Sequence, residues 1–157
     1  MATETKLTLS HETIGEMQDL VQVNIDSYNG FLEAAEKIED KQLAQLFRSY
    51  SSERSAQAAE LKGLLGASGE QPTERGSMSA AVHRAWIDVK AAFTGGGVHA
   101  VLAEAERGED HIKHMYEDAI KKTTGSAIND VLHRHYAKVK SAHDKIRDLR
   151  DAHAAKK

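Results

Sequence analysis

The chain of 157 residues contains no cysteine and only one proline. Without thiols it cannot form a disulfide, a zinc–thiolate site, an iron–sulfur cluster or a cysteine nucleophile. The single proline leaves long stretches without a helix breaker, and aromatic residues make up only 5% of the chain. Strands are rich in aromatic and β-branched residues, so these shortages favour an all-α fold over a β-sheet protein.

The sequence also lacks a long hydrophobic run and a large excess of either charge. No segment approaches the roughly 20 apolar residues that a membrane-spanning helix needs, and the first ten residues lack the apolar core of a signal peptide. The formal net charge is −3, unlike the strongly basic balance of a dedicated nucleic-acid binder. We therefore expect a cytoplasmic protein that enters no membrane, and the charge balance does not favour nucleic-acid binding.

Apolar residues recur every three or four positions in four long segments, which is the period of an amphipathic α-helix. These segments cover residues 10–39, 41–65, 98–123 and 126–154. Ser10 and Asp40 stand where they can cap the first two helices, and Gly125 follows the third. After a loop with the only proline, a shorter stripe predicts an extra helix at 79–93.

The lengths of the connections predict how these helices are arranged. The link between the first two helices is so short that they must lie antiparallel. The link between the second and third long helices is long enough to return along the bundle as a crossover, which contains the short extra helix. A chain of 157 residues suits one domain, so we predict a single all-α domain, residues 1–157, built as a four-helix bundle.

Each long helix carries polar residues where its apolar stripe should continue. In an antiparallel bundle with aligned ends, these residues fall within about two helical turns of a common plane. They are Asn24 in the first helix, Glu53, Arg54 and Gln57 in the second, Glu109 in the third, and His135 and His143 in the fourth. The sequence therefore predicts a central polar layer.

One interpretation of the layer is a buried polar network. Arg54 could pair with Glu109, helped by Asn24 and His135, so that no isolated charge is buried. Such a network need not add net stability, and its best-attested use is to specify one packing of the helices. We favour this interpretation.

The other interpretation is a metal site, because bundles with a long crossover and inward carboxylates and histidines are typical of ferritin-like di-metal proteins. Those sites need Glu-x-x-His on two helices. Here Ala56 stands where the second helix would need histidine, and Lys140 where the fourth would need glutamate. The remaining candidate ligands are Glu53, Glu109, His135 and His143. They could hold one iron or other divalent ion loosely, but we expect no cofactor.

Other groups of residues give weaker indications of a binding or catalytic site. The basic run from Lys138 to Arg150 is interleaved with aspartates that roughly halve its charge. His83 and Arg84 beside Trp86 could bind an anion, although a structural contact explains them as well. No serine, lysine or carboxylate pair forms a recognisable hydrolase or transferase set, so the sequence favours a non-catalytic role.

A set of short strings spread over residues 10–152 is distinctive. The strings are Asp26-x-x-x-Gly30-Phe31-x-x-Ala34-Ala35, Arg54 with Glu60-Leu61, His83-Arg84-x-Trp86, Glu106-x-Gly108-Glu109-Asp110 with Tyr116, and His143-Asp144 leading to Leu149-Arg150-Asp151. Together they resemble an uncharacterised bacterial family of ferritin-like four-helix-bundle proteins. The resemblance implies the fold, a bacterial cytoplasmic setting and a link to stress. It implies no activity, substrate or catalytic residue.

We therefore predict a ferritin-like four-helix-bundle protein of non-catalytic role, with a central buried polar network. One alternative is a metal-binding, iron-handling protein with a degenerate site. Another is a stress protein that associates with nucleic acid or protein partners, which predicts strongly salt-dependent binding. The sequence leaves the small-molecule substrate unknown and allows a homo-oligomer, since the striped helices could also pair between chains.

Overall fold

The computed structural model describes residues 4–70 and 97–155, and within these ranges every long element is an α-helix. The helices are α1 (His11–Lys37), α2 (Lys41–Ala67), α4 (Val98–Lys122) and α5 (Asn129–Ala155). The prediction of an all-α four-helix bundle is confirmed. The helix predicted at 79–93 lies outside the described residues.

The first two helices begin at the caps that the sequence predicts. The Ser10 side chain accepts a hydrogen bond from the Thr13 backbone N–H at 3.2 Å. The Asp40 carboxylate accepts from the N–H groups of Gln42 and Leu43 at 3.0 and 3.1 Å. Each cap satisfies backbone donors that the first helical turn leaves without a partner.

The turn between α4 and α5 differs from the prediction, because α5 begins at Asn129 rather than at residue 126. Gly125 has a φ of 83°, the left-handed backbone that glycine adopts most easily after a helix. The Asn129 side chain then donates to the carbonyls of Ile120 and Thr123, both 3.2 Å away. This amide ties the start of α5 to the last turn of α4.

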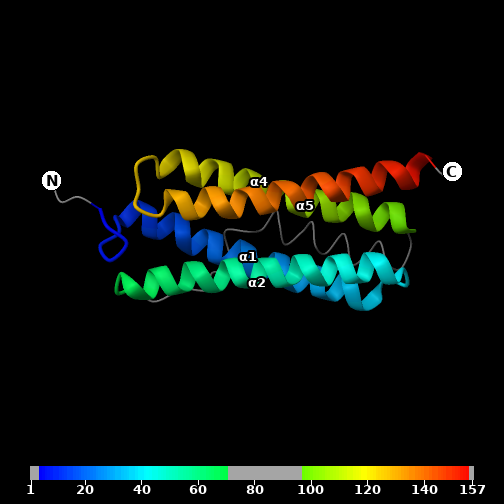
Figure 1. The fold of residues 1–157 in the computed structure, drawn as a ribbon, viewed down its shortest axis with the longest axis horizontal. Helices are drawn as coiled ribbons and strands as arrows, with labels where there is room; N and C mark the ends of the chain where they lie inside the picture. The colour runs from blue at the N-terminus through cyan, green and yellow to red at the C-terminus, as the bar shows by residue number, and fades with distance from the viewer. Residues whose placement is uncertain (1–3, 71–96, 156–157) are drawn as a thin grey trace.

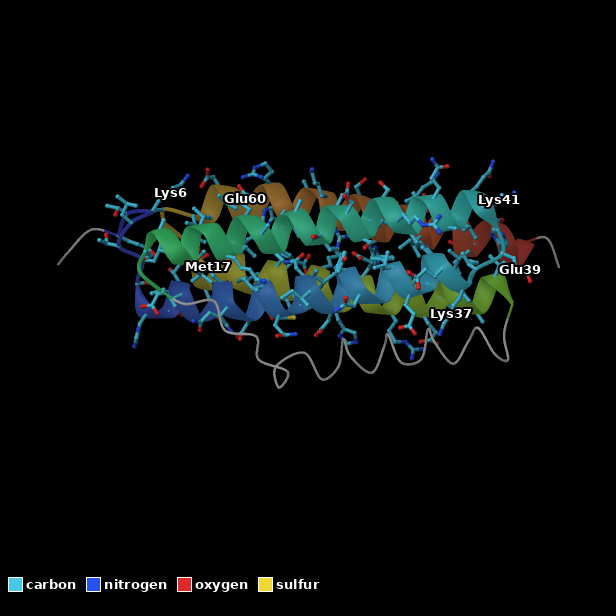
Figure 2. The ribbon with its side chains drawn as sticks, turned by 90° about the horizontal axis from the view of Figure 1, so that it is seen from below. Lys6, Met17, Lys37, Glu39, Lys41 and Glu60 are labelled. Atoms are coloured by element: carbon cyan, nitrogen blue, oxygen red, sulfur yellow. The ribbon has the colours of Figure 1, made fainter. Side chains whose placement is uncertain are left out.

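The four helices form one elongated bundle (Figure 1). α1 runs antiparallel to α2, α4 runs antiparallel to α5, and α1 also packs against α4. α2 ends and α4 begins at opposite ends of the bundle, so α2 and α4 run parallel. Figure 2 shows Lys37, Glu39 and Lys41 at the end where α1 turns into α2, and Lys6 at the other end.

Aliphatic and aromatic side chains fill the core along most of its length. Towards the α1–α2 turn, the Phe31 ring lies 5.6 Å from that of Phe47 and 5.5 Å from that of Tyr50, between ring centroids. Towards the other end, Met17 and Leu61 are buried completely. Between these apolar regions the core is interrupted by buried polar side chains. No helix in the described ranges is long and apolar enough to cross a membrane.

Candidate functional site

A fully buried ion pair joins α2 to α4 near the middle of the bundle. The side chains of Arg54 and Glu109 are both 0% exposed. Arg54 Nη2 donates to Glu109 Oε2 at 2.8 Å, and Arg54 Nε donates to Oε1 at 3.3 Å. Two parallel bonds from a planar guanidinium fix the relative orientation of the two side chains as well as their distance.

The surroundings of Glu109 shift the pKa of its carboxyl in two opposite directions. Burial raises the pKa of the Glu109 carboxyl, while the Arg54 guanidinium acts against that rise. Ser27 on α1 adds a weaker contact, since its hydroxyl lies 3.4 Å from Glu109 Oε1. Arg54 therefore gives the largest stabilisation of the carboxylate, and His143 and Ser27 add smaller contributions.

A second chain of hydrogen bonds starts at Asn24 on α1. Asn24 Nδ2 donates to the Leu20 carbonyl and to the Tyr116 hydroxyl, both at 2.8 Å. The Tyr116 hydroxyl lies 3.0 Å from Nδ1 of His135 on α5. Burial raises the pKa of Tyr116, so the phenol stays protonated. Three helices, α1, α4 and α5, thus meet at a single hydroxyl group.

The series of hydrogen bonds continues from His135 to the surface. His135 Nε2 lies 2.7 Å from Glu60 Oε1 on α2, and Glu60 also accepts two bonds from Arg134 at 2.7 and 2.9 Å. Hydrogen bonds from Arg134 and His135 hold the pKa of Glu60 at about 2, whereas burial lowers the pKa of His135. The Glu60 side chain is 36% exposed, so the chain runs from the core to solvent.

The direction of each bond in this chain follows from the donors available. A carbonyl can only accept, so Leu20 requires the nitrogen of the Asn24 amide to face it and Tyr116. The Tyr116 hydroxyl then donates to Nδ1 of His135, and His135 donates from Nε2 to the Glu60 carboxylate. Because burial lowers the pKa of His135, we assign these directions to the neutral tautomer that carries its proton on Nε2.

Gln57 closes a ring of contacts. Its Nε2 donates to the His135 backbone carbonyl at 3.3 Å. Gln57 lies one helical turn along α2 from Arg54. Asn24 and Ser27 are likewise one turn apart on α1. We call the whole set the central network: Asn24, Ser27, Arg54, Gln57, Glu109, Tyr116 and His135, with Glu60 and Arg134 at its surface end. It takes side chains from all four helices.

His143 is buried and contacts other carboxylates, although its electrostatic effect also lowers the pKa of Glu109. Its Nε2 is 3.6 Å from Glu106 Oε1 and 3.4 Å from Asp110 Oδ1, and its Nδ1 is 3.1 Å from Asp144 Oδ1. Glu106 is also bonded by Arg150. His143 therefore links α5 to the carboxylates of α4, two turns along α5 from His135.

The four side chains that the sequence grouped as metal ligands have different partners in the structure. Glu109 binds Arg54, whereas His135 binds Tyr116 and Glu60. The Glu53 side chain is 32% exposed, and its nearest cation is Arg54 Nη1 at 3.7 Å. Across residues 4–70 and 97–155, no group of three or more His, Asp or Glu side chains has the geometry of a metal site.

Four members of the network were not expected from the sequence. Tyr116 reads as one more apolar residue of the α4 stripe, and Ser27 is small enough to pass as a packing residue. Glu60 and Arg134 read as surface charges. The signal available was helical spacing: Glu60 and Gln57 are three residues apart on α2, and Ser27 and Asn24 are three apart on α1.

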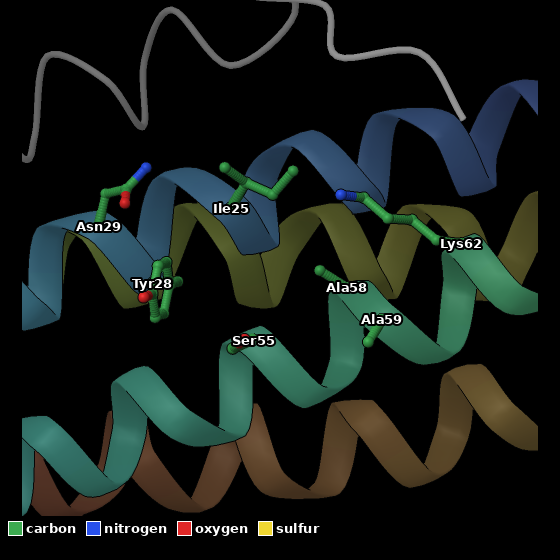
Figure 3. A pocket seen from close by; sticks show the side chains of 7 residues that line it. All are labelled: Ile25, Tyr28, Asn29, Ser55, Ala58, Ala59 and Lys62. Carbon is green, nitrogen blue, oxygen red and sulfur yellow. The ribbon is translucent and has the colours of Figure 1, made fainter. Parts of the chain in front are cut away.

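The surface grooves over the described helices are lined by other residues. The groove between α1 and α2 has a volume of about 290 Å³, at the small end of the range for ligand pockets (Figure 3). Its walls are Ile25, Tyr28, Asn29, Ser55, Ala58, Ala59 and Lys62. Figure 3 shows these side chains on neighbouring turns of α1 and α2, and none of them belongs to the central network.

A four-helix bundle crossed by a buried polar network is thus the class of protein that the fold and the site define. The family model described as Domain of unknown function (DUF2383) matches residues 12–122, and the chain belongs to that family. The match takes in most of α1, all of α2 and α4, and ends at the last residue of α4. A search of curated proteins finds no match.

Proposed function

We propose that this protein is a non-catalytic helical bundle that acts through its outer surface, and that the central network fixes the alignment of its helices. The observation that carries the proposal is the Arg54–Glu109 pair, which is fully buried and joined by two hydrogen bonds. A substrate could reach neither charge without opening the bundle.

The energetics of buried ion pairs support a role in alignment. Removing two charges from water costs about as much as their attraction returns, so an apolar pair of similar volume is often as stable or more stable. A buried pair does, however, penalise every packing that separates its members, because each charge is then left alone. A shift of α2 along α4 by one turn, about 5.4 Å, would break both Arg54–Glu109 bonds.

The same argument extends to the other helices. Tyr116 binds Asn24 of α1 and His135 of α5, and Gln57 of α2 binds the His135 carbonyl. These hydrogen bonds are all at buried positions, where a lost partner costs about 1–3 kcal/mol. The network therefore favours one axial position for each of the four helices.

The family resemblance supports the finer parts of the proposal. We place the protein among ferritin-like bundles of the bacterial cytoplasm, with a stress-linked role exercised by its surface. A homo-oligomer is compatible with this proposal. Iron handling is the rival function, and it would require the network to open around a metal.

The alignment role is tested by replacing the ion pair with apolar side chains of similar size, Arg54→Met together with Glu109→Leu. The measurement is the amide ¹H–¹⁵N NMR spectrum and hydrogen exchange of the double variant and of wild type. A matched control is Lys37→Met with Glu33→Leu, which removes an exposed ion pair of α1 whose atoms lie 3.0 Å apart.

We expect the double variant to stay helical and to unfold at a temperature near that of wild type. Its amide signals should be broadened or doubled along α2 and α4, and its exchange faster there, because more than one helix register is populated. The control should match wild type. A double variant with one sharp set of signals and wild-type exchange would show that the pair is not needed for alignment.

A further inference from the structure

Within residues 4–70 and 97–155, three buried polar atoms of the central network have no hydrogen-bond partner: Asn24 Oδ1, Arg54 Nη1 and Gln57 Oε1. Arg54 Nη1 lies 3.7 Å from Glu53 Oε2, beyond hydrogen-bond distance. The two amide groups cannot remove the problem by rotating. Each nitrogen faces a backbone carbonyl, of Leu20 for Asn24 and of His135 for Gln57, and a carbonyl only accepts. The oxygens are therefore held where they are, in the interior of the bundle.

The three atoms belong to one closed ring of contacts. Arg54 and Gln57 are one turn apart on the same face of α2. Gln57 binds the His135 carbonyl, the His135 ring binds Tyr116, and Tyr116 binds Asn24. Arg54 binds Glu109, and Glu109 contacts Ser27, which is one turn from Asn24 on α1. The unpartnered atoms thus belong to side chains of one connected set, Asn24 on α1 and Arg54 and Gln57 on neighbouring turns of α2.

We propose that this ring of contacts encloses an ordered water molecule, held by Arg54 Nη1 and Gln57 Oε1 with Asn24 Oδ1 as its further acceptor. Water accepts one hydrogen bond from the guanidinium and donates its two protons to the two amide oxygens. Buried waters typically make about three such bonds, to groups that would otherwise be unsatisfied. They occur about once in 27 residues, so a chain of this length accommodates one readily.

The chemistry of the site selects water over an ion. A cation would face the Arg54 guanidinium, and an anion would face two amide oxygens and the Glu109 carboxylate. A buried polar group that is left unpaired lowers stability, so one molecule that satisfies three of them is strongly retained. The bound water would also join the ion pair to the Asn24–Tyr116–His135 chain, and this holds whether or not the network fixes helix alignment.

The test counts long-lived waters by ¹⁷O magnetic relaxation dispersion in wild type and in Gln57→Met. The methionine keeps the length of the side chain and removes the amide oxygen. Gln45→Met is the matched control, because Gln45 lies on the exposed face of the same helix. We expect Gln57→Met to have one long-lived water fewer than wild type, and Gln45→Met to have the wild-type number.

A crystal structure of the wild type at high resolution gives an independent answer that needs no variant. We expect density for a water within hydrogen-bond distance of Arg54 Nη1 and Gln57 Oε1. An unchanged water count in Gln57→Met would overturn the proposal. So would a crystal structure in which Arg54 Nη1 donates directly to either amide oxygen, with no water between them.

Discussion

Replacing Arg54 by methionine should destabilise the protein by about 3–5 kcal/mol, the usual cost of removing one partner from a buried ion pair. The reason lies in what remains around Glu109. Its carboxylate is 0% exposed, and after the loss of Arg54 its remaining hydrogen bond is the 3.4 Å contact with Ser27. Domains are stable by about 5–15 kcal/mol, so the expected loss is a large fraction of the total.

The assay is urea unfolding followed by circular dichroism, with thermal unfolding beside it. For a chain of this size 1 kcal/mol corresponds to about 2–4 °C, so the midpoint should fall by roughly 6–20 °C. Glu109→Leu should lower stability by a similar amount, because the buried Arg54 guanidinium then loses both of its hydrogen bonds to Glu109. The double variant should regain most of the loss, which makes the coupling between the two sites large.

An exposed ion pair provides the comparison. Lys37→Met removes a pair with Glu33 whose side chains are both more than 40% exposed, and it should cost about 0.5 kcal/mol or less. A cost for Arg54→Met no larger than that of this control would contradict the role of the buried pair. Losses from Arg54→Met and Glu109→Leu that simply add in the double variant would contradict it as well.

Three further predictions concern the chain that leads to the surface. Tyr116→Phe removes the hydroxyl shared by Asn24 and His135, and should cost about 1–3 kcal/mol in urea unfolding, whereas Tyr28→Phe on the α1 surface should cost little. The ¹⁵N shifts of His135 at neutral pH should report a neutral ring with its proton on Nε2; a proton on Nδ1 would contradict the assigned bond directions. The pKa of Glu60 is lowered from 4.5 to about 2, so its contribution is present above pH 4.5 and lost as the pH falls towards 2. Solvent screening limits that contribution to about 1 kcal/mol, and Glu60→Gln should flatten the pH dependence of stability in this window; an unchanged slope would contradict it.

The helices could be predicted from the sequence because the information they need is local. The apolar period gives the inner face of each helix, and Ser10 and Asp40 give two starts. The start of α5 was predicted three residues early, at 126. The residues before Asn129 form a turn, in which the Asn129 N–H bonds to the Ser126 carbonyl and the Asn129 side chain binds the end of α4. That contact depends on the folded turn, which the sequence pattern does not describe.

The candidate site was less predictable, because helical spacing gives the level of a residue along the bundle but not its partner. From their positions along the helices alone, His143 and Glu53 were predicted to lie beside Glu109. In the structure His143 faces Glu106 and Asp110, and Glu53 is partly exposed. Partners depend on the rotation of each helix and on side-chain rotamers, which form only when all the helices pack.

Metal analysis tests the central claim most directly. The protein should be purified without a chelator or an affinity tag, analysed for bound metal, and titrated with Fe(II) under air beside Glu109→Ala. A structural network predicts metal-free protein that neither binds nor oxidises iron, together with a clear loss of stability in the variant. Near-stoichiometric bound iron, or iron oxidation that disappears in Glu109→Ala, would contradict the account and place the function inside the bundle.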